Sequence, residues 1–268
     1  MKLTIAIILI VGLIQLLAQC LEAVTGFGST VLAVPFMDMG LRQVFDDPKD
    51  ALTAAKVVGG THTWLLVIYV AVVSWKQIVW KEFGFIALHV LLGLPIGIFL
   101  FHVMDITFLK GFLALFMIGV GINGIRVTRR DRYQMESSTA PVKKNFMMRF
   151  ILFLGGIIHG AFASGGPFVV FYASQALKDK TLFRVSICLL WLCLNTILLM
   201  EWTIAGVWTQ NDGYILKLLV ATLPFLLVGI IIGNYLHHRV SEYVFRLIVF
   251  ALLLGTGFIV MHDVLLRI

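Results

Sequence analysis

Charged residues are scarce in this chain of 268 residues. Asp, Glu, Lys and Arg together make up 13% of it, whereas soluble domains usually contain about 25%. Hydrophobic residues make up 60%, and the mean hydropathy is +0.99. A water-soluble fold of this length leaves too much surface in water to hide that apolar area. The composition therefore excludes a soluble globular enzyme and a disordered chain.

Cysteines and the common catalytic motifs are also scarce. The three cysteines, Cys20, Cys188 and Cys193, all lie in apolar runs, and their odd number argues against a disulfide framework. No HExxH, CxxC or Walker-type glycine loop occurs, and Gly-x-Ser-x-Gly is missing. We therefore expect no metal, no cofactor and no catalytic residues, and a protein that is not an enzyme.

Acidic residues are fewer than basic ones, 14 against 21, so the net charge is +7. Seven of the basic residues lie in one stretch: Arg126, Arg129, Arg130, Arg132, Lys143, Lys144 and Arg149. In a membrane protein such a cluster marks a loop that stays on the cytoplasmic side. The loop is short for a nucleic-acid surface, and we expect no nucleic-acid partner.

Long apolar runs dominate the remaining chain. A helix needs roughly 20 apolar residues to cross the hydrocarbon core of about 30 Å. Eight runs meet that standard: 3–39, 51–74, 83–103, 106–125, 150–177, 182–208, 214–236 and 243–262. The first run continues past Cys20, so we interpret it as retained and not as a signal peptide. The sequence predicts an all-α, polytopic integral membrane protein of the cell membrane, whose surroundings are the lipid bilayer.

A near-constant offset relates the two sides of the basic loop. The matched pairs are Gly93 with Gly229 and Gly97 with Gly233, both 136 apart, and Glu22 with His159 and Gly28 with Gly165, both 137 apart. One offset across several regions favours duplication. The prediction is a first transmembrane repeat at 1–125, a basic cytoplasmic linker at 126–149 and a second transmembrane repeat at 150–268.

The first run of each half is too long for one crossing. Residues 3–39 would form a helix of about 55 Å. Both runs are interrupted near the middle, at Glu22–Thr30 and at His159–Pro167, by glycines, small hydroxyls and a proline. If each broken run returns to its starting side, the halves are inverted. That arrangement puts 14 of the 21 basic residues on one side, against 12 for eight plain crossings, so we favour inverted-topology repeats.

The two breaks are the predicted binding site. A helix start exposes N–H groups with a partial positive charge of about +0.5. Glycine lets an oxyanion approach the backbone, and hydroxyls add donors. Two facing breaks would form an anion cradle from Thr25, Gly26, Gly28, Ser29, Ser164, Gly165 and Gly166. The alternative is that the glycines only permit close helix packing.

Two further residues are assigned to the substrate. Lys56 either supplies a fixed positive charge or extends its long stem to the interface. Asn195 is either a ligand or a hydrogen bond between helices. His237 and His238 lie at the end of a run, where we expect them to be solvated.

Three ionisable side chains are candidates for proton coupling: Glu22, His159 and His62. Charged groups are costly at bilayer depth, and histidine titrates near neutral pH. For His62 the alternative is an ordinary hydrogen-bonded side chain.

These residues resemble the sulfite exporter TauE/SafE-type family of bacterial membrane permeases. The resemblance is carried by Glu22–Pro35, by the second copy at His159–Pro167, by Lys56–Gly60 and by the basic loop. It covers essentially the whole chain. It implies transport of small, often sulfur-containing anions such as sulfite or sulfonates.

The resulting hypothesis is a secondary transporter, or permease, that moves a small anion by alternating access and couples it to protons. Two alternatives are a passive anion channel and a non-transporting membrane scaffold that docks a partner on the basic loop. The sequence leaves open whether the protein acts as a monomer or a homodimer.

Overall fold

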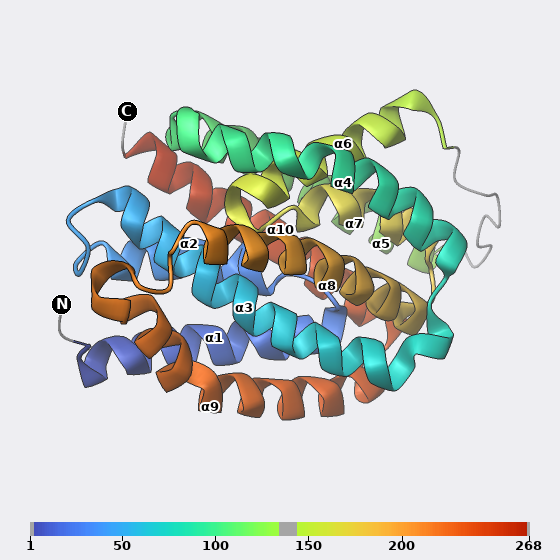
Figure 1. Cartoon of the computed structure of the whole chain (residues 1–268). Coiled ribbons are helices and arrows are strands. Elements are labelled where there is room, and N and C mark those ends of the chain that lie inside the picture. The colour runs from blue at the N-terminus through green and yellow to red at the C-terminus, as the bar shows by residue number, and fades with distance from the viewer. Residues whose placement is uncertain (1–2, 134–143, 267–268) are drawn as a thin grey trace. The chain divides into compact units, whose positions relative to one another are not determined.

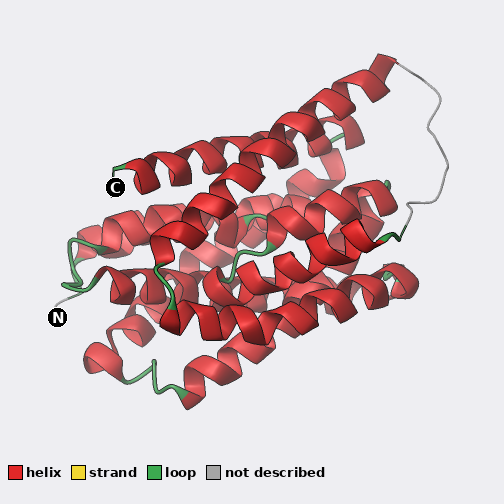
Figure 2. Ribbon diagram, turned by 90° about the horizontal axis from the view of Figure 1, so that it is seen from above, coloured by secondary structure: helices red, strands yellow, loops and turns green. Residues whose placement is uncertain are grey.

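The structure, a computed structural model, describes residues 3–133 and 144–266. These residues form helices and their connections, and no strand occurs among them (Figure 2). The helices of this part of the chain, labelled in Figure 1, are α1 (Ile5–Thr25), α2 (Ser29–Leu41), α3 (Pro48–Ser74), the 3-10 helix η1 (Trp75–Gln77), α4 (Trp80–Val103), α5 (Ile106–Tyr133), α6 (Phe146–Phe162), α7 (Gly166–Ala176), α8 (Lys180–Ile204), α9 (Gln210–Arg239) and α10 (Glu242–Leu265).

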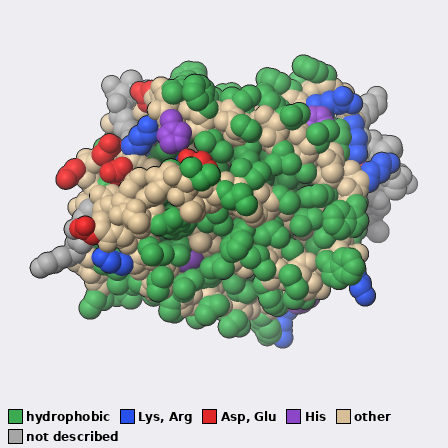
Figure 3. Space-filling view, in the orientation of Figure 1, with side chains coloured by type: hydrophobic (Ala, Val, Ile, Leu, Met, Phe, Trp, Pro, Cys, Tyr) green, Lys and Arg blue, Asp and Glu red, His purple; other side chains and the backbone are tan. Residues whose placement is uncertain are grey.

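Within the described ranges, seven helices are long and apolar enough to cross a membrane. They occupy Ile5–Thr25, Pro48–Gln77, Trp80–Val103, Lys110–Arg130, Lys180–Ile204, Gln210–Arg239 and Tyr243–Leu265. Large apolar side chains on them lie on the outside: Ile231 is 70% exposed and Phe99 is 63% exposed. Hydrophobic side chains cover much of the face in Figure 3. Such a surface is stable in lipid and not in water, which confirms the predicted all-helical, polytopic membrane protein.

Both long first runs are broken, as predicted. The first yields α1, whose 21 residues span about 31 Å, followed by the shorter α2. The second yields α6 and α7, which have 17 and 11 residues. The break in the first run therefore lies after a helix that is long enough to cross by itself, and not at the middle. Eight apolar runs become seven spans because the second broken run contributes no long helix.

The chain divides into two compact units. The first comprises Met1–Ile78 and Ile187–Arg239, and the second comprises Val79–Ser186 and Val240–Ile268. The first unit contains the whole of α1, α2, α3 and α9 and most of α8. The second contains α4, α5, α6, α7 and α10. Each unit thus combines helices from both sides of the basic loop, a different division from that into two sequence repeats.

The predicted basic linker at 126–149 is partly helical. Residues 126–133 continue α5, and residues 146–149 begin α6 after Asn145, whose side chain accepts a hydrogen bond from the Met148 N–H. Residues 134–143 lie outside the described part of the chain.

Each unit contains helices that meet at backbone contact. In the first unit, a β-carbon at Gly233 of α9 would lie 2.3 Å from the carbonyl oxygen of Cys20 in α1. In the second unit, a β-carbon at Gly97 of α4 would lie 1.9 Å from the carbonyl oxygen of Ile157 in α6. Glycine is therefore required at both contacts. The glycines are 136 residues apart and their partners 137 apart, close to the offset found in the sequence, and the duplication itself stays a prediction.

We predict that Gly97→Ala and Gly233→Ala each destabilise the protein by roughly 1–3 kcal/mol, because the added methyl group overpacks the contact. Thermal unfolding of purified protein in detergent measures the effect. Gly119→Ala and Gly255→Ala are matched controls, since a β-carbon at either position meets nothing within 4 Å. Equal melting temperatures for all four variants would contradict the packing described.

Candidate functional site

The first break consists of residues 26–28, between α1 and α2. Gly26 ends α1 in the left-handed conformation, with φ of +77°, and its N–H donates to the carbonyl oxygen of Glu22 at 2.6 Å. Gly28 has φ of +106° and precedes α2. Side chains other than glycine rarely adopt these angles, so the two glycines determine where the helix is interrupted.

Glu22 supplies the missing cap of α2. Gly28 has no side chain to accept the first N–H of the helix, and the Oε2 atom of Glu22 accepts the Ser29 N–H instead, at 2.7 Å. The Ser29 hydroxyl pairs with that of Thr63 on α3, with 2.6 Å between the oxygens. Glu22 is buried, and among the described residues its Oε1 atom has no hydrogen-bond partner. A carboxylate thus lies at the start of α2.

Two residues that the sequence analysis did not assign to the site hold the first break in place. The indole Nε1 of Trp191 in α8 donates to the Gly26 carbonyl oxygen at 2.9 Å. The Nδ1 atom of His237 in α9 lies 2.7 Å from the Val24 carbonyl oxygen. His237 is buried, so the expectation that it is solvated was wrong.

Sequence signals for both residues existed. Gly229, Gly233 and His237 are spaced by four and therefore share one face of α9, the face whose two glycines contact α1. Trp191 lies in the middle of an apolar run, where an indole N–H needs an acceptor.

A polar stripe on α1 leads to the first break. Gln15, Gln19 and Glu22 occupy positions i, i+4 and i+7, and all three are buried. The Gln19 amide donates to Gln15 Oε1 at 3.0 Å, and the Gln15 amide donates to the sulfur of Met37 at 3.1 Å. Sequence reasoning missed both glutamines, although amides at this spacing in an apolar helix are themselves a signal.

The second break consists of residues 163–165, between α6 and α7. Ala163 ends α6 in the left-handed conformation, with φ of +53°, and its N–H donates to the carbonyl oxygen of His159 at 2.7 Å. The Nδ1 atom of His159 accepts the Gly165 N–H at 3.3 Å. Gly165 packs against α6, because a β-carbon there would lie 2.2 Å from the Gly155 carbonyl oxygen. The two breaks share one design, in which the last turn of one helix caps the next.

The other three predicted residues lie in the first unit. His62 of α3 is buried, with Nε2 3.3 Å from the Leu219 carbonyl oxygen, and its Nδ1 has no partner in the described part of the chain. Lys56 is buried on the same helix, where Glu201 of α8 attracts it electrostatically. Asn195 is buried on α8, one turn beyond Trp191.

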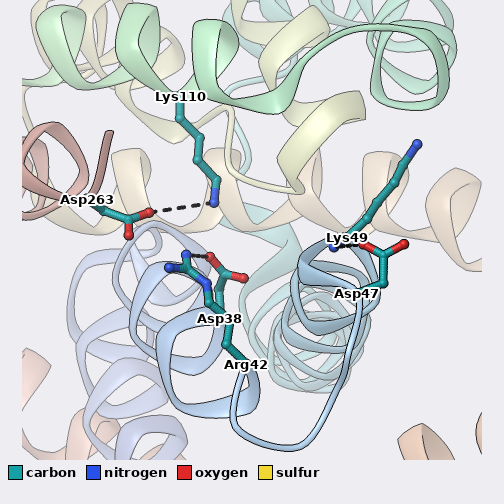
Figure 4. A network of polar contacts seen from close by, with 6 residues as sticks. All are labelled: Asp38, Arg42, Asp47, Lys49, Lys110 and Asp263. Atoms are coloured by element: carbon teal, nitrogen blue, oxygen red, sulfur yellow. Dashed lines mark hydrogen bonds and ion pairs between the residues drawn. The ribbon is translucent and has the colours of Figure 1, made fainter. Parts of the chain in front are cut away.

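Other charged side chains are held in ion pairs (Figure 4). In the second unit, Lys110 lies 4.0 Å from Asp263. In the first unit, Arg42 pairs with Asp38 within the last turn of α2. These side chains stabilise helix ends and do not belong to the breaks.

All the predicted site residues are buried. The structure groups Glu22, Thr25, Gly26, Gly28, Ser29, Lys56, His62 and Asn195 in the first unit, and His159, Ser164, Gly165 and Gly166 in the second. The residues of each break are brought together locally. The predicted single cradle made of both breaks stays a prediction, because each break lies in its own unit.

Buried breaks within long apolar runs are typical of multi-pass membrane transporters. The chain belongs to the family described as sulfite exporter TauE/SafE, whose model matches residues 10–260 and thus both breaks. No curated protein and no solved structure matches the chain. Family membership indicates a membrane transporter of sulfur-containing anions.

The capping role of Glu22 can be tested separately from transport. We expect Glu22→Ala to be less stable than Glu22→Gln by roughly 1–3 kcal/mol, since alanine leaves the buried Ser29 N–H without an acceptor whereas the glutamine carbonyl replaces it. Thermal unfolding in detergent compares the two variants. Equal stability would show that Glu22 does not cap α2.

Proposed function

We propose that this protein is a secondary transporter that carries a small anion, sulfite or an organosulfonate, across the cell membrane by alternating access. The observation that carries the proposal is the pair of helix breaks. Both are buried, both end a helix in the left-handed conformation, and both leave the start of a second helix inside the protein. Family membership supports the sulfur-containing substrate.

The chemistry of the breaks suits a small oxyanion. Lys56 is the buried cation among the predicted site residues, and Glu201 already attracts it. Backbone N–H groups and hydroxyls at the breaks, together with Lys56, suit a compact anion with several acceptor oxygens. Glycine at the breaks keeps side chains away from the approaching oxygens.

Proton coupling is assigned to Glu22, with His159 and His62 as further candidates. A buried carboxylate oxygen without a donor is unfavourable when charged, so a proton on Oε1 of Glu22 stabilises this arrangement. The helices packed around α1 bring other ionisable groups: Lys56 and His62 on α3, and His237 on α9. These surroundings allow Glu22 to bind and release a proton as its contacts change.

Uptake of radiolabelled sulfite and of labelled taurine into proteoliposomes tests the transport function. We expect saturable uptake of at least one of the two anions, faster when a pH gradient is imposed. A flux that rises linearly with concentration would indicate a channel instead. No flux of either anion would overturn the proposal, and equal saturable flux with and without the gradient would remove only the proton coupling.

The role of Glu22 in coupling is tested by Glu22→Gln. Because the amide keeps the cap but does not titrate, we expect the variant to lose its response to a pH gradient while it stays folded. Glu82→Gln is the matched control. Glu82 also lies in a membrane helix, but it bonds to Tyr172 and Lys144, at 2.6 and 2.9 Å, and caps neither α2 nor α7. Wild-type gradient dependence in Glu22→Gln would contradict the assignment.

A further inference from the structure

The polar stripe of α1 ends in two buried acceptor oxygens that lack a donor. Gln19 is 0% exposed and Glu22 is 1% exposed. Among the described residues, the Oε1 atom of neither side chain has a hydrogen-bond partner. The two residues are three apart in the helix, so they are neighbours on one face. Buried polar atoms are normally paired, and two neighbouring acceptors therefore call for a donor.

The other end of the stripe fixes the orientation of both amides. The sulfur of Met37 in α2 can only accept a hydrogen bond, so Gln15 must present its NH2 group there, at 3.1 Å. The Oε1 atom of Gln15 then accepts the NH2 group of Gln19 at 3.0 Å. With its NH2 group turned to Gln15, Gln19 leaves its carbonyl oxygen for the next position of the stripe. That position is Glu22.

A charged Glu22 does not fit this end of the stripe. Its Oε2 atom accepts the Ser29 N–H at 2.7 Å, whereas its Oε1 atom adds negative charge where Gln19 offers only an oxygen. A buried charge without a partner is costly. A water molecule would supply a donor but would leave the charge buried. One proton on Oε1 of Glu22 removes the charge and also supplies the donor that both oxygens lack.

The titratable groups on neighbouring helices do not supply this donor. The buried ones are Asp38 in α2, Lys56 and His62 in α3, Tyr214 and His237 in α9, and Cys188 in α8 beside the break. Asp38 pairs with Arg42 in the last turn of α2. Lys56 is attracted by Glu201. Both histidines lie against backbone carbonyl oxygens of other helices. No member of this set donates to either Oε1 atom, so the donor has to come from the solvent as a proton.

We infer that Glu22 and Gln19 together form the proton-binding site of the transporter, in which the Glu22 carboxyl group donates its proton to the carbonyl oxygen of Gln19. The role of this site rests on the proposed transport function, but the site itself requires no substrate. Gln15 and Met37 are positioning residues, because they hold the Gln19 amide in the orientation that accepts the proton.

Release of the proton has a consequence for the packing of α1. The carboxylate of Glu22 then needs a donor, which the Gln19 amide can supply only by turning its NH2 group away from Gln15. The oxygen of Gln15 loses its donor in turn, and its amide no longer has a reason to keep its NH2 group on the sulfur of Met37. Loss of one proton at the break therefore weakens the contact between α1 and α2.

Infrared difference spectroscopy on the purified protein tests the site without any substrate. A protonated carboxyl group has a C=O stretching band that a carboxylate lacks. We expect this band in the wild type at neutral pH and its loss in Glu22→Gln, which keeps an oxygen for the Ser29 N–H but has no proton to release. The pH at which half of the band disappears is the midpoint for release of the proton.

Two glutamine variants test the arrangement of the stripe. Gln19→Leu removes the acceptor, so we expect the midpoint to fall by about one pH unit, the value of one hydrogen bond. Gln15→Leu lies two turns from Glu22 but frees the Gln19 amide to turn and donate to the carboxylate, so we expect a fall in the same direction. Thr222→Val is the matched control and should keep the wild-type midpoint. Its buried hydroxyl bonds to carbonyl oxygens of its own helix.

Three results would overturn the inference. The first is a wild type without a band assigned to Glu22 at neutral pH, a result that does not depend on whether the glutamine variants fold. The second is an unchanged midpoint in both Gln19→Leu and Gln15→Leu when their melting temperatures match the wild type. The third is a band that disappears when sodium chloride replaces potassium chloride at constant pH, which would show that the two oxygens bind a metal cation.

The uptake assay separates this site from the transport function. Saturable uptake of sulfite or taurine by a wild type without the Glu22 band would reject the proton-binding site and leave the transporter. A Glu22 band with the expected shifts, in a protein without saturable uptake, would reject the transport function and leave the proton-binding pair.

Discussion

A membrane interior supplies no water to hydrogen-bond an exposed peptide group, and this constraint explains the structure of both breaks. Where α1 and α6 end, the next helix begins with N–H groups that have no partner in their own helix. Glu22 and His159, each in the last turn of the preceding helix, accept one of these groups. A break inside the membrane is stable when a nearby side chain accepts the N–H at the start of the next helix.

The same two side chains were assigned to proton coupling because they are ionisable at bilayer depth, and the structure gives them a second task. A residue that caps a helix and also binds protons links the charge of the site to the stability of the break. Protonation of Glu22 weakens its hold on the Ser29 N–H, whereas protonation of Nδ1 in His159 removes the acceptor for Gly165 altogether. In the proposed transport cycle, the geometry of each break and the binding of a proton would therefore depend on the same atoms.

Several parts of the site followed from residue types alone. Glycine pairs beside small hydroxyls located both breaks, and the long apolar runs predicted the helices around them. Other parts required the three-dimensional contacts. Trp191 is distant in sequence from Gly26, yet its indole N–H donates to the carbonyl oxygen there. His237 was expected to be solvated, but it is buried and lies against Val24, because the glycines of α9 bring this helix to backbone contact with α1.

By itself the sequence determined that this protein lies in a lipid bilayer, that it is helical and where its two long runs are interrupted. It could do so because apolar run length and glycine conformation act locally along the chain. Only the tertiary structure decided which helices pair, since α1 joins α9 and α4 joins α6 across the two sides of the basic loop. It also decided which side-chain atoms cap the two breaks, Oε2 of Glu22 at Ser29 and Nδ1 of His159 at Gly165. Neighbouring residues determine where a helix is interrupted, whereas helix packing determines which distant side chains hydrogen-bond to the interruption.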